Sequence, residues 1–183
     1  MRHLRWLLIA LLAWWTFRFV SNPLNAAIIA GSFLHLVNLP FHEAGHILFS
    51  PFGPFMTSLG GSLMQLIVPL VCAVSFARRE DWFAACICGW WIGENLIDLG
   101  PYIADARALQ LMLIGGGTGA EIEGHDWEAI LQSLGWLHLD RRLGMSAHIV
   151  GSVVMVGMLV TAAWLTVRAP ESSDVEESLS GRL

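Results

Sequence analysis

The side chains best suited to chemistry in this chain lie in residues 39–48, where His42, Glu43 and His46 form a His-Glu-x-x-His motif. On an α-helix, side chains four residues apart lie on the same face, so the two imidazoles could bind one metal ion. The Glu43 side chain would lie roughly 100° around the helix from His42, close enough to act on water at that ion. This spacing predicts a Zn²⁺ site in which His42 and His46 are ligands and Glu43 is the catalytic residue.

The surroundings of Glu43 support a metal site, because no other Asp, Glu, Lys or Arg occurs between Phe19 and Ala77. A carboxylate in lipid costs roughly 3 kcal/mol or more unless it faces a partner or a water-filled cavity. The alternative is a pair of core histidines beside a capping or surface glutamate. A surface position is hard to provide within such an apolar segment, so we expect a cation among these three side chains.

The composition indicates the class of protein that must position the motif. With 55% hydrophobic residues, 14% charged residues and a mean hydropathy of +0.60, the chain is far more apolar than a soluble domain. We predict an integral membrane protein, in the plasma (inner) membrane of a prokaryote. The 183 residues are enough for about five or six spanning helices of about 20 apolar residues each. The expected fold is all-α, with one transmembrane domain over residues 1–168 around a buried metal site and a disordered polar tail over 169–183.

Residue types exclude several other classes of function. All ten basic residues are arginine, and without lysine the chain can form neither a phosphate-binding P-loop nor a lysine Schiff base. The net charge is −5 and no basic patch is present, so nucleic acid is not an expected partner. Three cysteines lie in apolar segments without a Cys-x-x-Cys spacing, which indicates buried small side chains.

Apolar runs separated by turn residues or charges define the expected spans. No clear cleavage site follows the first run, so we expect a retained helix rather than a signal peptide. Pro40 removes one backbone donor inside the second run, which predicts a kink or a new helix start just before the motif. The predicted spans cover residues 6–20, 25–50, 60–77, 82–97 and 143–167.

The fourth predicted span carries a second polar cluster, formed by Glu94, Asn95 and Asp98. Glu94 and Asp98 are four residues apart and share one helix face. Carboxylates at these positions are as costly in lipid as Glu43, so we expect them to face the same cavity. The alternative is that this helix ends near Gly100 and Pro101 and that the acids reach water at the headgroups.

Residues 104–142 form the one long stretch of mixed polarity, and we interpret them as a surface loop with a short amphipathic helix. Asp126 is a suitable N-cap, and Gly135 is a suitable end. The helix is expected to lie on the membrane surface or to cover the site. His125 just before it could be a metal ligand, a hydrogen-bond donor to substrate or an ordinary loop histidine.

The motif within a membrane helix resembles the site-two protease group of intramembrane zinc metalloproteases. In that group a Gly-Pro-x-x-Asn element follows the motif helix, and residues 61–65, Gly-Ser-Leu-Met-Gln, are similar to it with Ser for Pro and Gln65 for Asn. The resemblance covers about residues 25–106. It implies a core of membrane helices around a buried zinc ion and cleavage of peptide bonds in membrane-embedded or membrane-adjacent substrates.

The third metal ligand has several candidates. The family has an Asn-x-x-Pro element followed closely by a ligand Asp in Asp-Gly, and here Asn95 resembles its start while Asp98 takes the Pro place. Asp105 comes two residues later than the family's ligand, with Ala in place of Gly. Glu94 and Asp98 also match a thermolysin-like spacing, in which the Glu binds zinc and the Asp orients a histidine. Asp98 belongs to the site in either pattern, so we predict His42, His46 and Asp98 as the ligands, with Glu94, Asp105 and His125 as alternative ligands or supporting residues.

The predicted function is zinc-dependent hydrolysis of peptide bonds, with a membrane protein or peptide as the substrate and the lipid bilayer as the surroundings. Zinc would lower the pKa of a water molecule towards about 7, and Glu43 would accept its proton. A substrate helix must unwind before cleavage, which favours Gly- or Pro-rich segments, and Asn95 or Gln65 could hydrogen-bond the unwound strand. Two alternatives stay open. One is a metal-binding but non-proteolytic assembly or chaperone-like protein, and the other is a small transport or structural subunit.

Overall fold

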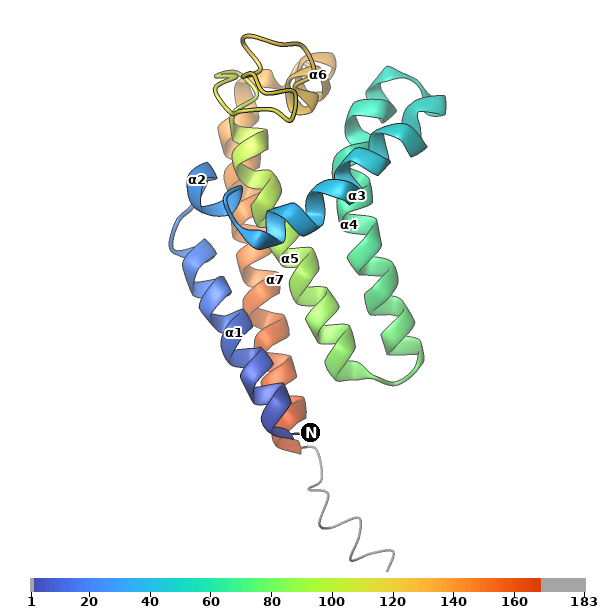
Figure 1. Cartoon of the computed structure of the whole chain (residues 1–183), viewed down its shortest axis with the longest axis vertical. Coiled ribbons are helices and arrows are strands. Elements are labelled where there is room, and N and C mark those ends of the chain that lie inside the picture. Colours follow the sequence, from blue (N-terminus) through green and yellow to red (C-terminus); the bar gives the residue numbers. More distant parts are fainter. Residues whose placement is uncertain (1, 169–183) are drawn as a thin grey trace, which may run out of the picture.

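The structure, a computed structural model, describes residues 2–168, and this part of the chain is all-helical, as predicted (Figure 1). Short 3-10 turns follow α3 and precede α7. The predicted disordered tail, residues 169–183, lies outside the described residues. The α-helices are α1 Arg2–Val20, α2 Ala26–Ile29, α3 Phe33–Phe49, α4 Pro54–Arg78, α5 Trp82–Ala104, α6 Asp126–Ser133 and α7 Asp140–Arg168.

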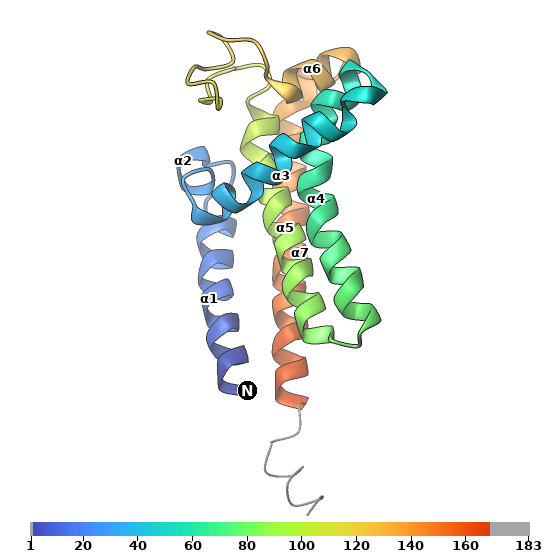
Figure 2. The same cartoon turned by 45° about the vertical axis from the view of Figure 1, so that its right-hand side comes forward.

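Four long helices run along the length of the molecule, and α3 crosses them obliquely (Figures 1 and 2). The first helix starts at one end, and α4, α5 and α7 then run alternately between the two ends. The α6 helix and the loop before it cover the other end. This arrangement brings the end of the motif helix α3 to the end of the bundle that residues 105–139 cover.

The second predicted span is interrupted earlier than expected. The chain leaves helix geometry around Gly31, and the Ser32 hydroxyl accepts a hydrogen bond from the His35 backbone N–H at 3.2 Å, so Ser32 begins a new helix. An N-cap serine satisfies one of the four free N–H groups of a helix start. Of the two alternatives predicted at Pro40, the new helix start is wrong, because α3 has already begun at Phe33 and continues through Pro40.

Two other helices extend six or seven residues beyond the predicted spans. The third run extends back to Pro54, a residue type suited to the first position of a helix because it has no N–H to leave unpaired. The fourth extends through Pro101 to Ala104, so Glu94 and Asp98 lie well inside α5 and not at its end. Both acids are buried, which argues against contact with water at the headgroups.

Glycines let α5 and α7 approach each other closely. A Cβ atom added at Gly151 would lie 2.5 Å from the carbonyl oxygen of Gly93, and one added at Gly144 would lie 2.5 Å from that of Gly100. These pairs are seven residues apart on each helix, so they repeat along one face. Small residues of this kind are typical of helix contacts in membranes, and they leave the opposite face of α5 for its polar side chains.

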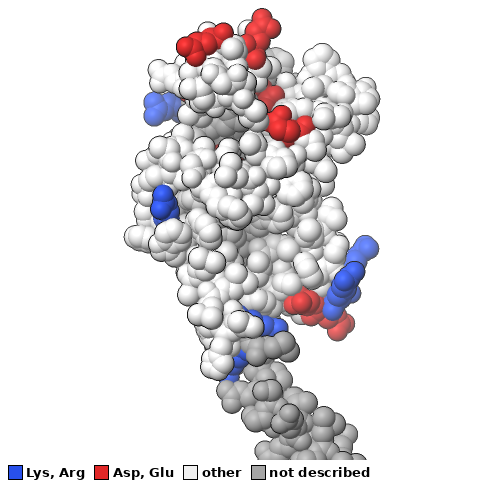
Figure 3. Space-filling view, viewed as in Figure 1, with Lys and Arg blue, Asp and Glu red and all other residues white. Residues whose placement is uncertain are grey.

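Two helices of the described part are long and apolar enough to cross a membrane. They cover Pro54–Arg78 and Leu137–Arg168, with mean hydropathies of 1.9 and 2.0 over their best windows. The expected five or six spans are not shown among the described residues. Figure 3 shows charged side chains gathered towards the two ends of the molecule and almost none on the face between them.

Candidate metal centre

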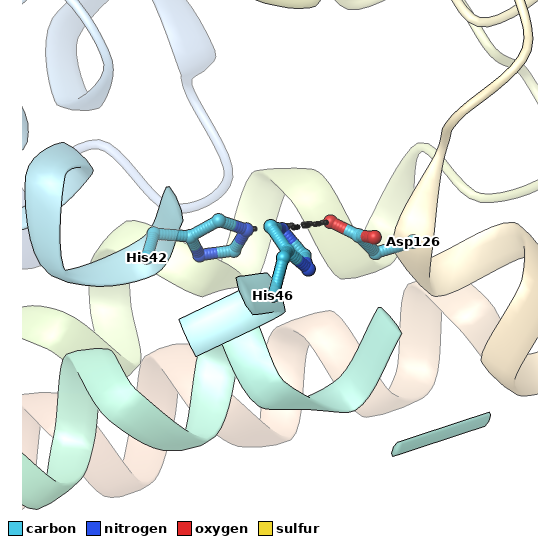
Figure 4. A group of neighbouring side chains, drawn as sticks. All are labelled: His42, His46 and Asp126. Carbon is cyan, nitrogen blue, oxygen red and sulfur yellow. Dashed lines mark hydrogen bonds and ion pairs between the residues drawn. The ribbon is translucent and has the colours of Figure 1, made fainter. Parts of the chain in front are cut away.

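Three side chains from two distant parts of the chain converge at the covered end of the bundle. His42 and His46 lie one turn apart on α3, with ring centroids separated by 4.9 Å. The Nε2 atoms of both imidazoles lie 3.3 Å from Oδ2 of Asp126, the first residue of α6. Figure 4 shows the three side chains directed towards one another. Their ligand atoms lie within 4.8 Å of one another, so this group could hold a metal ion.

The two nitrogen-to-oxygen separations fit a single ion. Two ligand atoms that are each about 2.0–2.1 Å from a tetrahedral zinc ion lie about 3.3 Å apart. Both Nε2 to Oδ2 distances have this value. Two imidazoles and one carboxylate form a donor set that zinc accepts, with a fourth position left for water or substrate.

The far side of each imidazole is hydrogen-bonded, as in metal-binding histidines. Nδ1 of His46 lies 2.8 Å from the backbone carbonyl oxygen of Thr57, which can only accept, so this nitrogen carries a proton. Nδ1 of His42 lies 3.0 Å from Oε1 of Gln65. With protons on both Nδ1 atoms, the Nε2 atoms of neutral imidazoles would carry none. Their lone pairs would then face, and be repelled by, the lone pairs of the Asp126 carboxylate. A cation between them, either a metal ion or protons, is needed to hold this geometry.

Asp126 is held in place from both its backbone and its side chain. The Tyr102 hydroxyl donates to Oδ2 at 3.0 Å and accepts from the Asp126 N–H at 2.9 Å. The Trp127 indole N–H donates to the Ser62 hydroxyl at 3.2 Å, which fastens α6 to α4. Burial alone would raise the pKa of the Asp126 carboxyl. Where protons rather than a metal ion occupy the Nε2 positions, hydrogen bonds from the protonated His42 and His46 imidazoles outweigh burial, and this pKa lies below its ordinary value.

Gly61 on α4 provides the space beside the two imidazoles. A Cβ atom there would lie 2.6 Å from His42 Nε2 and 2.7 Å from His46 Nε2, on the side of the rings that would face an ion. Gly61→Ala is therefore expected to displace the imidazoles and to reduce the zinc content of the purified protein severely, with little loss of helicity. Gly157→Ala on α7 is the control, since a Cβ atom there meets nothing within 4 Å. A full equivalent of zinc in Gly61→Ala would contradict the expected geometry.

Glu43 shares a cavity with these three residues. The cavity has a volume of about 820 Å³ and lies between α3, the end of α5 and the loop around Leu111–Gly115. His42, Glu43, His46 and Asp126 all line it, together with Tyr102. Glu43 itself is exposed, so the expectation that its apolar segment leaves it no surface position is wrong; α3 crosses the bundle obliquely and this residue lines the open cavity.

The other predicted ligands on α5 lie behind His42, away from the Nε2 atoms. Asp98 accepts from Gln65 Nε2 at 2.7 Å and contacts His35 Nδ1 at 2.9 Å. Glu94 accepts from Asn38 Nδ2 at 2.9 Å. The carboxylate at the two imidazoles is thus Asp126 where Asp98 was predicted, because the polar face of α5 is directed towards the Nδ1 side of His42.

Asp105, His125 and Asn95 also lie away from the Nε2 atoms. Asp105 accepts from the backbone N–H groups of Gln110 and Leu111 at 3.1 and 2.9 Å and so shapes the loop. His125 Nε2 lies 3.5 Å from Asp105. The Asn95 amide donates to the Trp91 carbonyl of its own helix at 2.9 Å.

Asp126 was identified in the sequence as an N-cap and not as a ligand. The structure assigns the cap to His125, whose Nδ1 accepts from the Glu128 N–H at 3.2 Å. The capping role therefore lies one residue earlier, and this frees the Asp126 carboxylate to reach the imidazoles. The only signal in the sequence was an acid at the start of a helix expected to cover the site.

No protein-family model, curated protein or solved structure matches this chain. The description of the protein therefore rests on its own fold and site. The chain is all-helical over its described residues, has two helices able to cross a membrane, and contains a His42, His46 and Asp126 group that could hold a metal ion.

Proposed function

We propose that the protein is a zinc-dependent membrane endopeptidase that hydrolyses peptide bonds of membrane-embedded or membrane-adjacent substrates. The observation that carries this proposal is the convergence of two Nε2 atoms and one carboxylate oxygen at 3.3 Å, with Glu43 of the same motif in the adjoining cavity. The ligands in this proposal are His42, His46 and Asp126, so Asp126 replaces Asp98 as the third.

The chain's own groups account for the proton transfers of peptide hydrolysis. A bound zinc ion would supply Lewis-acid chemistry, polarising the substrate carbonyl and acidifying a water molecule. The Glu43 carboxylate accepts the proton of the attacking water and delivers it to the leaving amine. The Tyr102 hydroxyl keeps Asp126 in place through two hydrogen bonds while this occurs.

The proposed membrane arrangement has four crossings, formed by α1, α4, α5 and α7. These helices contain 19, 25, 23 and 29 residues. At about 1.5 Å per residue, the shortest of them reaches about 28 Å, close to the thickness of a bilayer core. The oblique helix α3 rises from the middle of the bundle to the covered end, which would put the metal centre near one membrane surface. An apolar cavity at that depth suits a locally unwound membrane segment.

Metal removal tests this function directly. Protein purified in detergent without added chelator is expected to contain one equivalent of zinc. It should cleave members of a panel of single-span peptides that carry Gly or Pro within the span, detected by mass spectrometry. A strong chelator should abolish cleavage, and added Zn²⁺ should restore it.

The controls separate the proposal from its alternatives. His42→Ala prepared in the same way should contain no zinc and cleave nothing. Wild-type protein that contains no metal would contradict the metal centre. That result would support the alternative of a transport or structural subunit. A full equivalent of zinc without cleavage of any peptide would instead support a metal-binding assembly or chaperone-like protein.

A further inference from the structure

We propose that Asp98, acting through Gln65, is a positioning residue that fixes the protonation of the His42 imidazole so that Nε2 is free to bind the metal. This inference rests on the proposed metal centre. It gives a role to a buried acid of α5 that does not reach the candidate ion. The connection runs across three helices, from Asp98 on α5 to Gln65 on α4 and His42 on α3.

The first step concerns the orientation of the Gln65 amide. An ionised carboxylate can only accept hydrogen bonds, so the Gln65 group 2.7 Å from Asp98 Oδ2 must be its NH₂. Turning the amide round would place two oxygens against each other in a buried site. Gln65 is 3% exposed, so little water can reach that contact to relieve it.

The second step follows from the other end of the same amide. With its NH₂ directed to Asp98, Gln65 presents Oε1 to His42 Nδ1 at 3.0 Å. This oxygen can only accept, so Nδ1 of His42 must carry a proton. In a neutral imidazole the remaining nitrogen is then unprotonated, and here that nitrogen is Nε2, which faces Asp126.

The Asp98 carboxylate has further contacts that keep it in position. Its Oδ1 lies 2.9 Å from His35 Nδ1, and its Oδ2 accepts from Asn38 Nδ2 at 3.4 Å. The Asn38 amide is itself oriented, because its oxygen accepts at 2.8 Å from the indole N–H of Trp91, a group that can only donate. The NH₂ of Asn38 therefore faces the two carboxylates of α5.

The comparison with His46 shows why His42 needs this connection. The backbone carbonyl of Thr57 fixes the proton of His46 directly, at 2.8 Å from Nδ1. A side-chain amide such as Gln65 has an accepting and a donating end, so by itself it does not choose which nitrogen of His42 is protonated. The Asp98 carboxylate, on the other side of Gln65, makes that choice. This role accounts for a buried carboxylate that shares the Asn38 amide with Glu94.

A charge-swap experiment tests the inference. Asp98→Asn replaces an acceptor by a group that can either donate or accept, so Gln65 can turn and His42 can hold its proton on Nε2. Loss of such an outer partner typically weakens metal binding about 10–100-fold, and we expect a loss of that size in the zinc dissociation constant from chelator competition. Adding Gln65→Glu to Asp98→Asn restores a group at position 65 that only accepts, with the net charge of the wild type. Zinc affinity should then return to within a few-fold of wild type.

A control variant, two spectroscopic measurements and a substitute variant complete the test. Asp81→Asn is the matched control, since this acid caps the far end of α5 and should leave zinc affinity unchanged. Circular dichroism checks folding, and the absorption spectrum of Co²⁺-substituted protein should change in Asp98→Asn and revert in the double variant. Gln65→Met serves if Asp98→Asn does not fold, and it should show the same loss of affinity because it removes the acceptor for His42.

The outcomes distinguish this inference from the proposed function. Wild-type protein that binds no zinc would overturn the metal centre and this inference with it. Wild-type protein that binds zinc, with Asp98→Asn binding it equally tightly, would overturn the inference alone. A weakened Asp98→Asn that the second substitution does not restore would also overturn it, because a merely structural role for Asp98 predicts that result.

Discussion

Replacing Glu43 by glutamine is expected to lower turnover about 10²–10⁴-fold, the usual contribution of a general base, while the zinc content stays at one equivalent. Glutamine has the same shape but cannot accept a proton from water. Glu43 is exposed in the cavity, and the hydrogen bonds that position His42 and His46 come from Gln65 and Thr57, so the metal ligands should stay in place. The two readouts are the cleavage rate of a peptide from the single-span panel and metal analysis of the same sample.

The control for this variant is Glu80→Gln, an exposed acid in the turn between α4 and α5 at the far end of the molecule, which should cleave at the wild-type rate. Unchanged cleavage by Glu43→Gln would remove Glu43 from the mechanism. A cellular role that survives Glu43→Gln but not His42→Ala would favour the non-proteolytic, metal-binding alternative.

Asp126→Ala is expected to weaken zinc binding by more than the about 10–100-fold typical of an outer partner, because it removes a direct ligand. The substitution leaves two imidazoles, and it also removes the acceptor for the Tyr102 hydroxyl that fastens α6 to α5. Zinc dissociation constants from chelator competition measure the effect. Asp105→Ala is the matched comparison, because that acid shapes the same loop without reaching the imidazoles, and it should retain most of its zinc.

A comparison of Asp126→Ala with Asp98→Ala decides between the two candidates for the third metal ligand. If Asp126→Ala kept a full equivalent of zinc while Asp98→Ala lost it, the ligand first predicted from the sequence would be correct and the Asp126 assignment would fail. A loss in Asp126→Ala together with a smaller effect in Asp98→Ala fits a ligand on one side of His42 and a positioning residue on the other.

Apolar runs in the sequence do not determine how the helices divide or at what angle they pack. Residues 25–50 form one apolar run in the sequence, yet the chain divides there at Ser32 and α3 crosses the bundle obliquely. Hydropathy indicates that a segment avoids water, but it does not indicate the angle at which the segment packs against its neighbours. The glycine pairs of α5 and α7 likewise acquire meaning only once the two helices are seen in contact.

The sequence by itself determined the helical class, the apolar character and the pairing of His42 with His46, because each depends on local properties such as composition or a spacing of four residues along one helix. The tertiary structure alone decided which carboxylate meets those imidazoles. Asp126 is 84 residues from His42 in the chain, and its approach depends on how α6 packs on α4 and α5. The same packing directs the polar face of α5, and with it Asp98, towards the Nδ1 side of the His42 ring, opposite to Asp126. Contacts between distant segments arise from the packing of whole helices, so the residue pattern within a single helix cannot predict them.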